Sequence, residues 1–199
     1  MATHVVIGNG SNLLVSDKGF DGTVVCIGKN MSDITVQGNE IRAMAGALLS
    51  TIASVARSHS LAGFEFASGI PGTIGGAVFM NAGAYGSDVE RVLVSAEYYD
   101  LSTGETATLM DEEMQLDYRH SIFMEHPDWV VLSGVFKLSF GNGEDIREKM
   151  KANMDSRRDK QPLEFPSAGS VFKRPVDNFA AKMIDTAGLK GVSVGGAQV

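Results

Sequence analysis

One long stretch of the chain, residues 66–87, has the composition of a phosphate-binding surface. It contains no charged side chain but six glycines, together with polar residues such as Thr73 and Asn81. Glycine at this density usually lets the main chain approach another group closely or take a positive φ. Free backbone N–H groups hold a phosphate without adding charge. A membrane helix needs about twenty apolar residues, and the glycines and Pro71 argue against one. The stretch therefore predicts a buried cofactor loop.

A second loop, GNGSN at residues 8–12, follows an apolar segment and has the same character. Alternating glycine, asparagine and serine after a strand favour a nest of backbone amides. The dinucleotide fingerprint requires a third glycine where Leu13 stands and a helix after it, so this motif fails. The residues also leave open a simple tight β-turn.

Two further segments carry side chains that suit anionic substrates. Arg119 lies among aromatic residues, and its planar guanidinium can pair with a carboxylate or phosphate at two points. Small residues surround Ser170 and leave its hydroxyl open, while Lys173 and Arg174 add positive charge. The alternatives are a surface arginine and a capped turn. A serine hydrolase is not supported, because the G-x-S-x-G frame is missing.

The sequence gives no support for a metal site. The four histidines have no H-x-x-x-H or H-E-x-x-H spacing, and the acidic residues 111–113 read as the start of a short helical turn. The net charge of −7 and the pI near 5.0 argue against general binding to nucleic acid or membrane surfaces. The lone Cys26 excludes an internal disulfide, and its apolar neighbours predict a core position. No signal peptide is visible, so a cytoplasmic protein is expected.

The elements that would position these groups combine many strands with few long helices, which predicts an α+β fold. Apolar periodicity and turn residues place strands and helices along the chain. A glycine-rich turn at residues 141–143 is the best domain boundary, dividing the chain into 1–141 and 142–199. Expected strands are residues 4–7, 23–27, 34–37, 40–45, 89–101, 106–109, 129–140 and 192–194, and expected helices are 47–59, 144–160 and 179–186.

Taken in order, the motifs resemble those of the UDP-N-acetylenolpyruvoylglucosamine reductases, flavoenzymes that complete UDP-N-acetylmuramic acid in peptidoglycan precursor synthesis. Each motif alone is a weak indicator, whereas five in order with compatible spacing are specific. The motifs are GNGSNLL at 8–14, GIPGTIGGA at 69–77, NAGAYG at 81–86, YRHSIF at 118–123 and SAGSVFKRP at 167–175, with AGLKG at 187–191 and GGA at 195–197 fitting the tail.

The resemblance implies an FAD-binding domain of the vanillyl-alcohol-oxidase type at residues 1–141. A smaller α+β substrate-binding domain would follow at residues 142–199. Both domains are expected to be incomplete, lacking the family's first strand–helix unit and its C-terminal glutamate. The chain is similar to the branch without the tyrosine-bearing insertion.

The resemblance also implies roles for particular residues. Arg119 would stabilise the enolate that forms when hydride adds to the substrate, and Ser170 would donate a proton to carbon. Tyr118, Lys160 and Arg174 would bind substrate with them. FAD would be held tightly but without a covalent bond, and NADPH would supply the hydride. The cofactor residues implied are Gly8, Asn9, Gly10, Ser11, Asn12, Leu13, Gly69, Ile70, Pro71, Gly72, Thr73, Gly75, Gly76, Ala77, Asn81, Ala82, Gly83 and Ala84.

A UDP-sugar is thus the expected partner, with no nucleic acid and no membrane, in a monomer or weak homo-oligomer. Two other interpretations stay open. One is a different FAD oxidoreductase of the same fold, against which the motifs around Arg119 and Ser170 count. The other is a non-catalytic or weakly FAD-binding fragment of such an enzyme.

Overall fold

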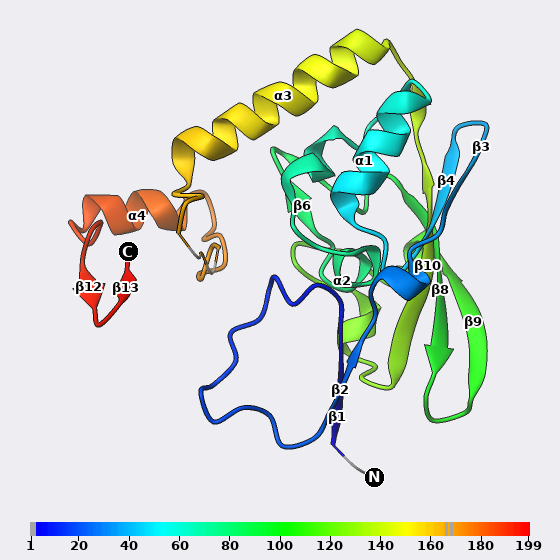
Figure 1. The fold of residues 1–199 in the computed structure, drawn as a ribbon, viewed down its shortest axis with the longest axis horizontal. Coiled ribbons are helices and arrows are strands. Elements are labelled where there is room, and N and C mark those ends of the chain that lie inside the picture. Colours follow the sequence, from blue (N-terminus) through cyan, green and yellow to red (C-terminus); the bar gives the residue numbers. More distant parts are fainter. Residues whose placement is uncertain (1–2, 166, 168) are drawn as a thin grey trace. The chain divides into compact units, whose positions relative to one another are not determined.

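The computed structural model describes residues 3–165, 167 and 169–199, which divide into two compact units, Met1–Phe165 and Pro166–Val199. The first unit is built on a five-stranded antiparallel sheet (Figure 1). Its strand order is β3-β4-β10-β8-β9. The strands are β3 (Ile34–Gln37), β4 (Glu40–Met44), β8 (Leu93–Asp100), β9 (Glu105–Met110) and β10 (Trp129–Lys137).

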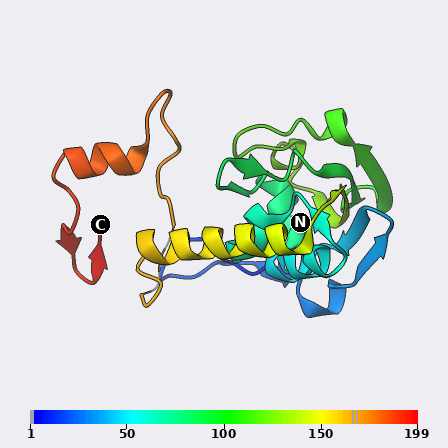
Figure 2. The ribbon, with the colours of Figure 1, turned by 90° about the horizontal axis from the view of Figure 1, so that it is seen from above.

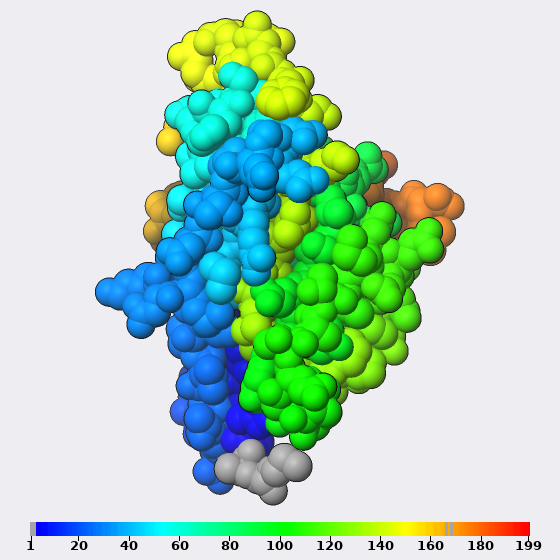
Figure 3. Space-filling view, turned by 90° about the vertical axis from the view of Figure 1, so that its right-hand side faces the viewer, coloured from blue at the N-terminus to red at the C-terminus, as the bar shows by residue number. Residues whose placement is uncertain are grey.

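Local turn chemistry sets the order of this sheet. Gly38 takes φ +60° in the two-residue turn between β3 and β4, where Gln37 pairs with Glu40. Strand β10, the long β-rich segment, lies between β4 and β8. In Figure 3 its residues lie between those of the β3–β4 hairpin and those of the β8–β9 hairpin. The predicted hairpin at residues 34–45 is confirmed.

Helices cover one face of the sheet (Figure 1). The apolar repeat predicted at residues 47–59 forms α1 (Leu49–Ser58), which buries one stripe of side chains. The glycine-rich stretch begins in the 3-10 helix η2 (Glu65–Gly69) and continues into α2 (Ile74–Phe79), a short helix that glycine content obscured in the sequence. Phe66, within η2, and Phe64, directly before it, are buried in the same core as α1 and the sheet.

The first strands form a separate parallel pair, β1 (His4–Ile7) with β2 (Thr23–Cys26). Here the sequence prediction for Cys26 is wrong. The residue is exposed, because every residue of β2 faces solvent and the strand pairs only with β1 in the part of the chain that the structure describes. Its thiol donates a hydrogen bond to the Gly8 carbonyl at 3.5 Å.

The longest helix, α3 (Gly143–Lys160), begins where Asn142 caps it by accepting a hydrogen bond from the Glu144 amide at 2.7 Å. It packs beside α1 and η2 (Figure 2). Ile146 is buried and Met150 packs against the core, as ordinary packing residues would. Helix α3 belongs to the first compact unit, and the functional boundary after residue 141 stays a prediction.

The second unit contains α4 (Ala180–Thr186) and a small hairpin, β12 (Ser193–Val194) with β13 (Ala197–Gln198). Across the described residues, none of the helices combines the length and apolarity that crossing a membrane requires. The remaining short elements are η1 (Lys29–Met31), β5 (Leu61–Ala62), β6 (Gly83–Ala84), β7 (Ser87–Asp88), η3 (Asp111–Met114), η4 (Ile122–Met124) and β11 (Ser139–Phe140).

Candidate active site

The two glycine loops singled out in the sequence lie against each other. The side-chain amide of Asn9 donates to the Pro71 carbonyl at 2.9 Å. Gly8 sits so close to Thr73 that a Cβ at position 8 would lie 2.1 Å from the Thr73 hydroxyl oxygen. A Cβ on Gly72 would lie 3.9 Å from the Ser11 hydroxyl. The segments around residues 8–11 and 71–73 therefore form one continuous surface, although about sixty residues separate them in the chain.

A cavity of about 420 Å³ borders this surface. Thr73 lines it and is only 4% exposed, yet among the described residues its hydroxyl has no hydrogen-bond partner. A buried polar group without a partner costs roughly 1–3 kcal/mol. The oxygen atom is itself shielded from solvent beside Gly8, so the hydroxyl would donate to a ligand oxygen only after the Thr73 side chain turned towards the cavity. The cavity is lined by Gly8, Asn9, Cys26, Ile27, Gly28, Lys29, Ser32, Ile34, Gly46, Ala47, Leu48, Thr51 and Thr73.

The second half of the glycine-rich stretch holds Arg119. The guanidinium donates to the Asn81 carbonyl at 3.1 Å and to the Gly83 carbonyl at 2.8 Å. Its central carbon lies 5.2 Å from the centre of the Tyr118 ring. Arg119 itself has φ +56°, a conformation that non-glycine residues adopt rarely. The structure therefore brings together four residues predicted to bind cofactor or substrate, namely Asn81, Gly83, Tyr118 and Arg119.

The side chain of Asn81 is committed to contacts within the protein. It is 1% exposed, and its amide nitrogen donates to the Asp117 carbonyl at 2.9 Å and to the Glu90 carboxylate at 3.3 Å. Its amide oxygen accepts from the Glu90 backbone N–H at 3.0 Å. The side chain thus ties the end of the glycine-rich stretch to the turn that carries Arg119.

Sequence reasoning missed a set of residues on α3 that hold the start of the glycine-rich stretch. Arg157 donates to the Gly69 carbonyl, and Asn153 donates to the Glu65 carbonyl at 3.2 Å. The Lys149 ammonium lies 3.4 Å from the Glu65 carboxylate, which also accepts from the Gly63 amide at 3.0 Å. Helix α3 therefore holds η2 in place through Lys149, Asn153 and Arg157, which we call the α3 brace.

A pattern in the sequence could have revealed this brace. Lys149, Asn153 and Arg157 recur at four-residue spacing, which places them on one face of a helix. Glu65 is the last charged residue before the uncharged stretch and is only 4% exposed, so a buried carboxylate there needs a partner.

The other residues predicted to bind the cofactor differ in how deeply they are buried. Ala77 is buried in the core, and Ile70 packs against it. A Cβ on Gly75 would lie 3.1 Å from the Ala45 side chain, so this glycine lets α2 approach the sheet region closely. Asn12 and Leu13 are exposed, beside a turn in which the Leu13 amide donates to the Gly10 carbonyl at 3.3 Å.

The other predicted substrate residues are Lys160, Ser170 and Arg174. Lys160 is the exposed last residue of α3. Ser170 and Arg174 are exposed residues of the second unit, and the Arg174 guanidinium carbon lies 4.2 Å from the centre of the Phe179 ring. Ala168 of the same motif lies outside the described residues.

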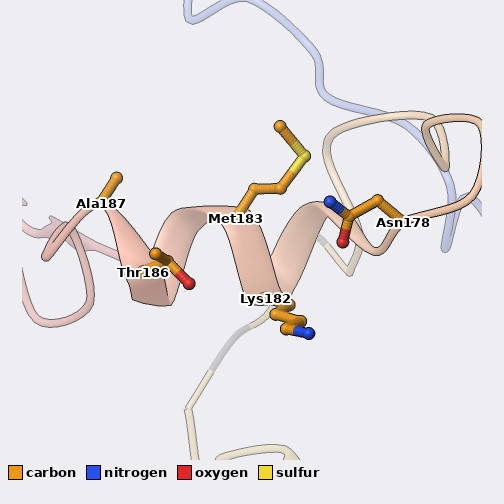
Figure 4. Close-up of a pocket in the computed structure, with 5 residues that line it drawn as sticks. All are labelled: Asn178, Lys182, Met183, Thr186 and Ala187. Carbon is orange, nitrogen blue, oxygen red and sulfur yellow. The ribbon is translucent and has the colours of Figure 1, made fainter.

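A second hollow, of about 310 Å³, lies along α4 in the second unit. Figure 4 shows Met183 and Lys182 pointing to different sides of the helix, so the hollow is an open helix surface. None of the predicted site residues lines it. Nowhere in the described ranges do three or more metal-ligating side chains gather at one point.

Comparisons with known proteins agree with these features. Residues 2–110 match the family described as "FAD binding domain", and residues 161–199 match "UDP-N-acetylenolpyruvoylglucosamine reductase, C-terminal domain". The chain is 50% identical over 194 residues to the UDP-N-acetylenolpyruvoylglucosamine reductase of Caldanaerobacter subterraneus subsp. tengcongensis, covering 98% of this chain and 63% of that protein. Identity to the enzyme of Pediococcus pentosaceus is also 50%, with 98% and 64% covered.

A solved structure of the same kind of enzyme also matches this chain. The crystal structure of the reductase from Thermus caldophilus matches with a TM-score of 0.87 and 33% identity, covering 100% of this chain and 71% of that one. The predicted α+β fold, with an FAD binding domain before a different C-terminal domain, is confirmed. The chain spans 63% of the length of the first curated relatives. On sequence, domain content and fold together, the chain belongs to the UDP-N-acetylenolpyruvoylglucosamine reductase family.

Proposed function

We propose that this chain carries the FAD-binding and reaction site of an NADPH-dependent reductase that converts UDP-N-acetylenolpyruvoylglucosamine to UDP-N-acetylmuramate. The observation that carries the proposal is the meeting of the two glycine loops at Gly8 and Thr73. We expect this contact to place backbone N–H groups of both loops beside the cavity, where the Thr73 hydroxyl has no partner among the described residues. Backbone N–H groups and hydroxyls are the groups that suit a pyrophosphate.

The residues present fit FAD. The segment 8–13 and the segment 69–77 would hold its pyrophosphate and neighbouring groups, with the Thr73 hydroxyl gaining the partner that it lacks among the described residues. The close approach at Gly8 leaves no room for any side chain there. When bound, FAD would supply to the substrate the hydride that it received from NADPH.

Arg119 would act on the charge that this reduction creates. Hydride addition to the vinyl carbon remote from the substrate carboxylate pushes an electron pair towards that carboxylate. Two backbone carbonyls already orient the guanidinium, so its remaining N–H groups need little reorganisation to meet an anion. A well-placed donor of this kind is typically worth roughly 3 kcal/mol in the transition state. Tyr118, beside the guanidinium, would contact the same substrate.

Ser170 would complete the reaction by donating its hydroxyl proton to the carbon that bears the carboxylate. A serine hydroxyl is a weak acid, so this role requires a strongly basic enolate and nearby positive charge. Lys173 and Arg174 follow it in the sequence and supply such charge. Lys160 would bind the carboxylate or diphosphate. In this proposal the protein is a cytoplasmic monomer or weak homo-oligomer.

The test is to titrate the purified chain with FAD, follow flavin fluorescence, and then measure NADPH oxidation with and without the enolpyruvyl sugar nucleotide. We expect saturable quenching and NADPH oxidation that depends on the sugar nucleotide. Protein that binds no FAD contradicts the proposal. FAD binding with NADPH oxidation that ignores the sugar would instead favour another FAD oxidoreductase of the same fold.

A further inference from the structure

We propose that Asn81 is a positioning residue for Arg119, acting through the turn at residues 117–120 rather than by side-chain contact with the cofactor. The inference rests on the proposed function, because it assigns a role in that reaction to a residue predicted to line the cofactor. It is carried by the hydrogen bonds of one buried amide.

The Asn81 side chain has no donor left for a ligand. Both amide N–H groups have acceptors, the Asp117 carbonyl and the Glu90 carboxylate, and the amide oxygen accepts from the Glu90 backbone. An asparagine side chain carries only two N–H donors. At 1% exposure, the side chain is also closed off from a ligand.

Asn81 contacts the arginine turn at two points. Its side chain binds the carbonyl of Asp117, and its own carbonyl accepts from the Arg119 guanidinium at 3.1 Å. Asp117 and His120 pair across this turn, with backbone hydrogen bonds of 3.2 and 3.1 Å. Asn81 therefore contacts both the backbone that carries Arg119 and the guanidinium itself, which the Gly83 carbonyl also holds at 2.8 Å.

Asn81 and Arg119, which contact each other, both have a positive φ. Asn81 has φ +41° and Arg119 has φ +56°. Asparagine tolerates this region better than most residues, but at Arg119 left-handed backbone costs roughly 1–3 kcal/mol and persists only where surrounding contacts hold it. The hydrogen bonds of the Asn81 amide supply such contacts, so their loss should release the turn.

The test compares Asn81→Gly with Asn81→Asp in the FAD-loaded protein. Glycine accepts the left-handed backbone but removes the amide, whereas aspartate keeps the acceptor for Glu90 N–H and places a carboxylate against the Asp117 carbonyl. For both we expect reoxidation of reduced flavin by the sugar nucleotide to slow at least tenfold. Flavin reduction by NADPH and FAD affinity should stay within threefold of wild type. Asn30→Gly, at an exposed position of η1, is the matched control.

Two further measurements separate positioning from a general structural effect. The double variant Asn81→Gly/Arg119→Ala should reoxidise no more slowly than Arg119→Ala alone, because a residue that acts through Arg119 has nothing left to position. Hydrogen–deuterium exchange should rise in peptides covering residues 117–121 of Asn81→Gly, without FAD or substrate present.

The outcomes are distinct. Additive losses in the double variant overturn the inference. A loss of FAD affinity larger than the loss in reoxidation rate also overturns it, and points to direct contact between Asn81 and the cofactor. If the wild-type protein does not turn over, the proposed function fails while hydrogen exchange still decides this inference. Unchanged exchange at residues 117–121 would then overturn it.

Discussion

The contact between Gly8 and Thr73 gives a prediction that needs no substrate. A methyl group at position 8 would lie 2.1 Å from the Thr73 hydroxyl oxygen, whereas real Cβ contacts essentially never fall below 3.0 Å. Either the Thr73 side chain must therefore rotate, or one of the two segments must move by about 1 Å. Overpacking of this kind costs roughly 1–3 kcal/mol. In a chain of this size that corresponds to a fall in Tm of roughly 2–12 °C.

The same geometry predicts a rescue. Once the hydroxyl is removed by Thr73→Ala, the closest remaining atom of residue 73 is its Cβ, 3.3 Å from the new methyl group. Gly8→Ala/Thr73→Ala should therefore recover most of the stability lost in Gly8→Ala. It should not recover full FAD affinity, because the hydroxyl proposed to meet the cofactor is gone.

Thermal and urea unfolding of the four proteins in this cycle, without FAD, measure the effect. Gly143→Ala is the matched control, since its nearest neighbouring atom is 3.7 Å away, an ordinary contact. Wild-type stability in Gly8→Ala would refute the close approach. A double variant no more stable than Gly8→Ala would show that the hydroxyl is not the obstacle.

Two other predictions concern the neighbours of this contact. Arg157→Ala should lower FAD affinity about tenfold, since it removes a hydrogen bond from a charged donor to the Gly69 carbonyl, worth roughly 1.5–3 kcal/mol. Isothermal titration should show no such loss for Arg158→Ala, which changes an exposed residue. Equal losses in the two variants would contradict the role of α3 in holding η2. The single thiol, Cys26, borders the cavity, so bound FAD should slow its labelling by N-ethylmaleimide, followed by mass spectrometry. Equal labelling with and without FAD would place the cofactor elsewhere.

Much of the fold was predictable because local chemistry decides it. The Gly38-Asn39 turn determines a hairpin by backbone geometry alone, and α1 follows from the spacing of its apolar residues. Short α2 escaped prediction because glycine is a poor helix former, and its packing against the core overrides that preference. Cys26 was wrongly placed because an apolar run forms a core strand only where another layer covers it.

The candidate site was predictable as a set of segments but not as a set of contacts. The glycine loops and Arg119 were found from residue type and spacing. Three features depend on contacts between distant segments. They are the hydrogen bonds that bury the Asn81 side chain, the Thr73 hydroxyl that lacks a partner in the described part of the chain, and the hydrogen bond from Arg157 to Gly69. Periodicity places Lys149, Asn153 and Arg157 on one face of a helix, but composition and periodicity do not say which distant segment that face meets.

The central claim is that these loops hold FAD for the reduction of an enolpyruvyl sugar nucleotide. The most direct measurement loads the chain with FAD, reduces it anaerobically with one equivalent of NADPH, and then mixes it with the sugar nucleotide. Oxidised-flavin absorbance should disappear with NADPH and return in full with the sugar nucleotide. Flavin that NADPH reduces but that stays reduced after the sugar nucleotide is added would contradict it.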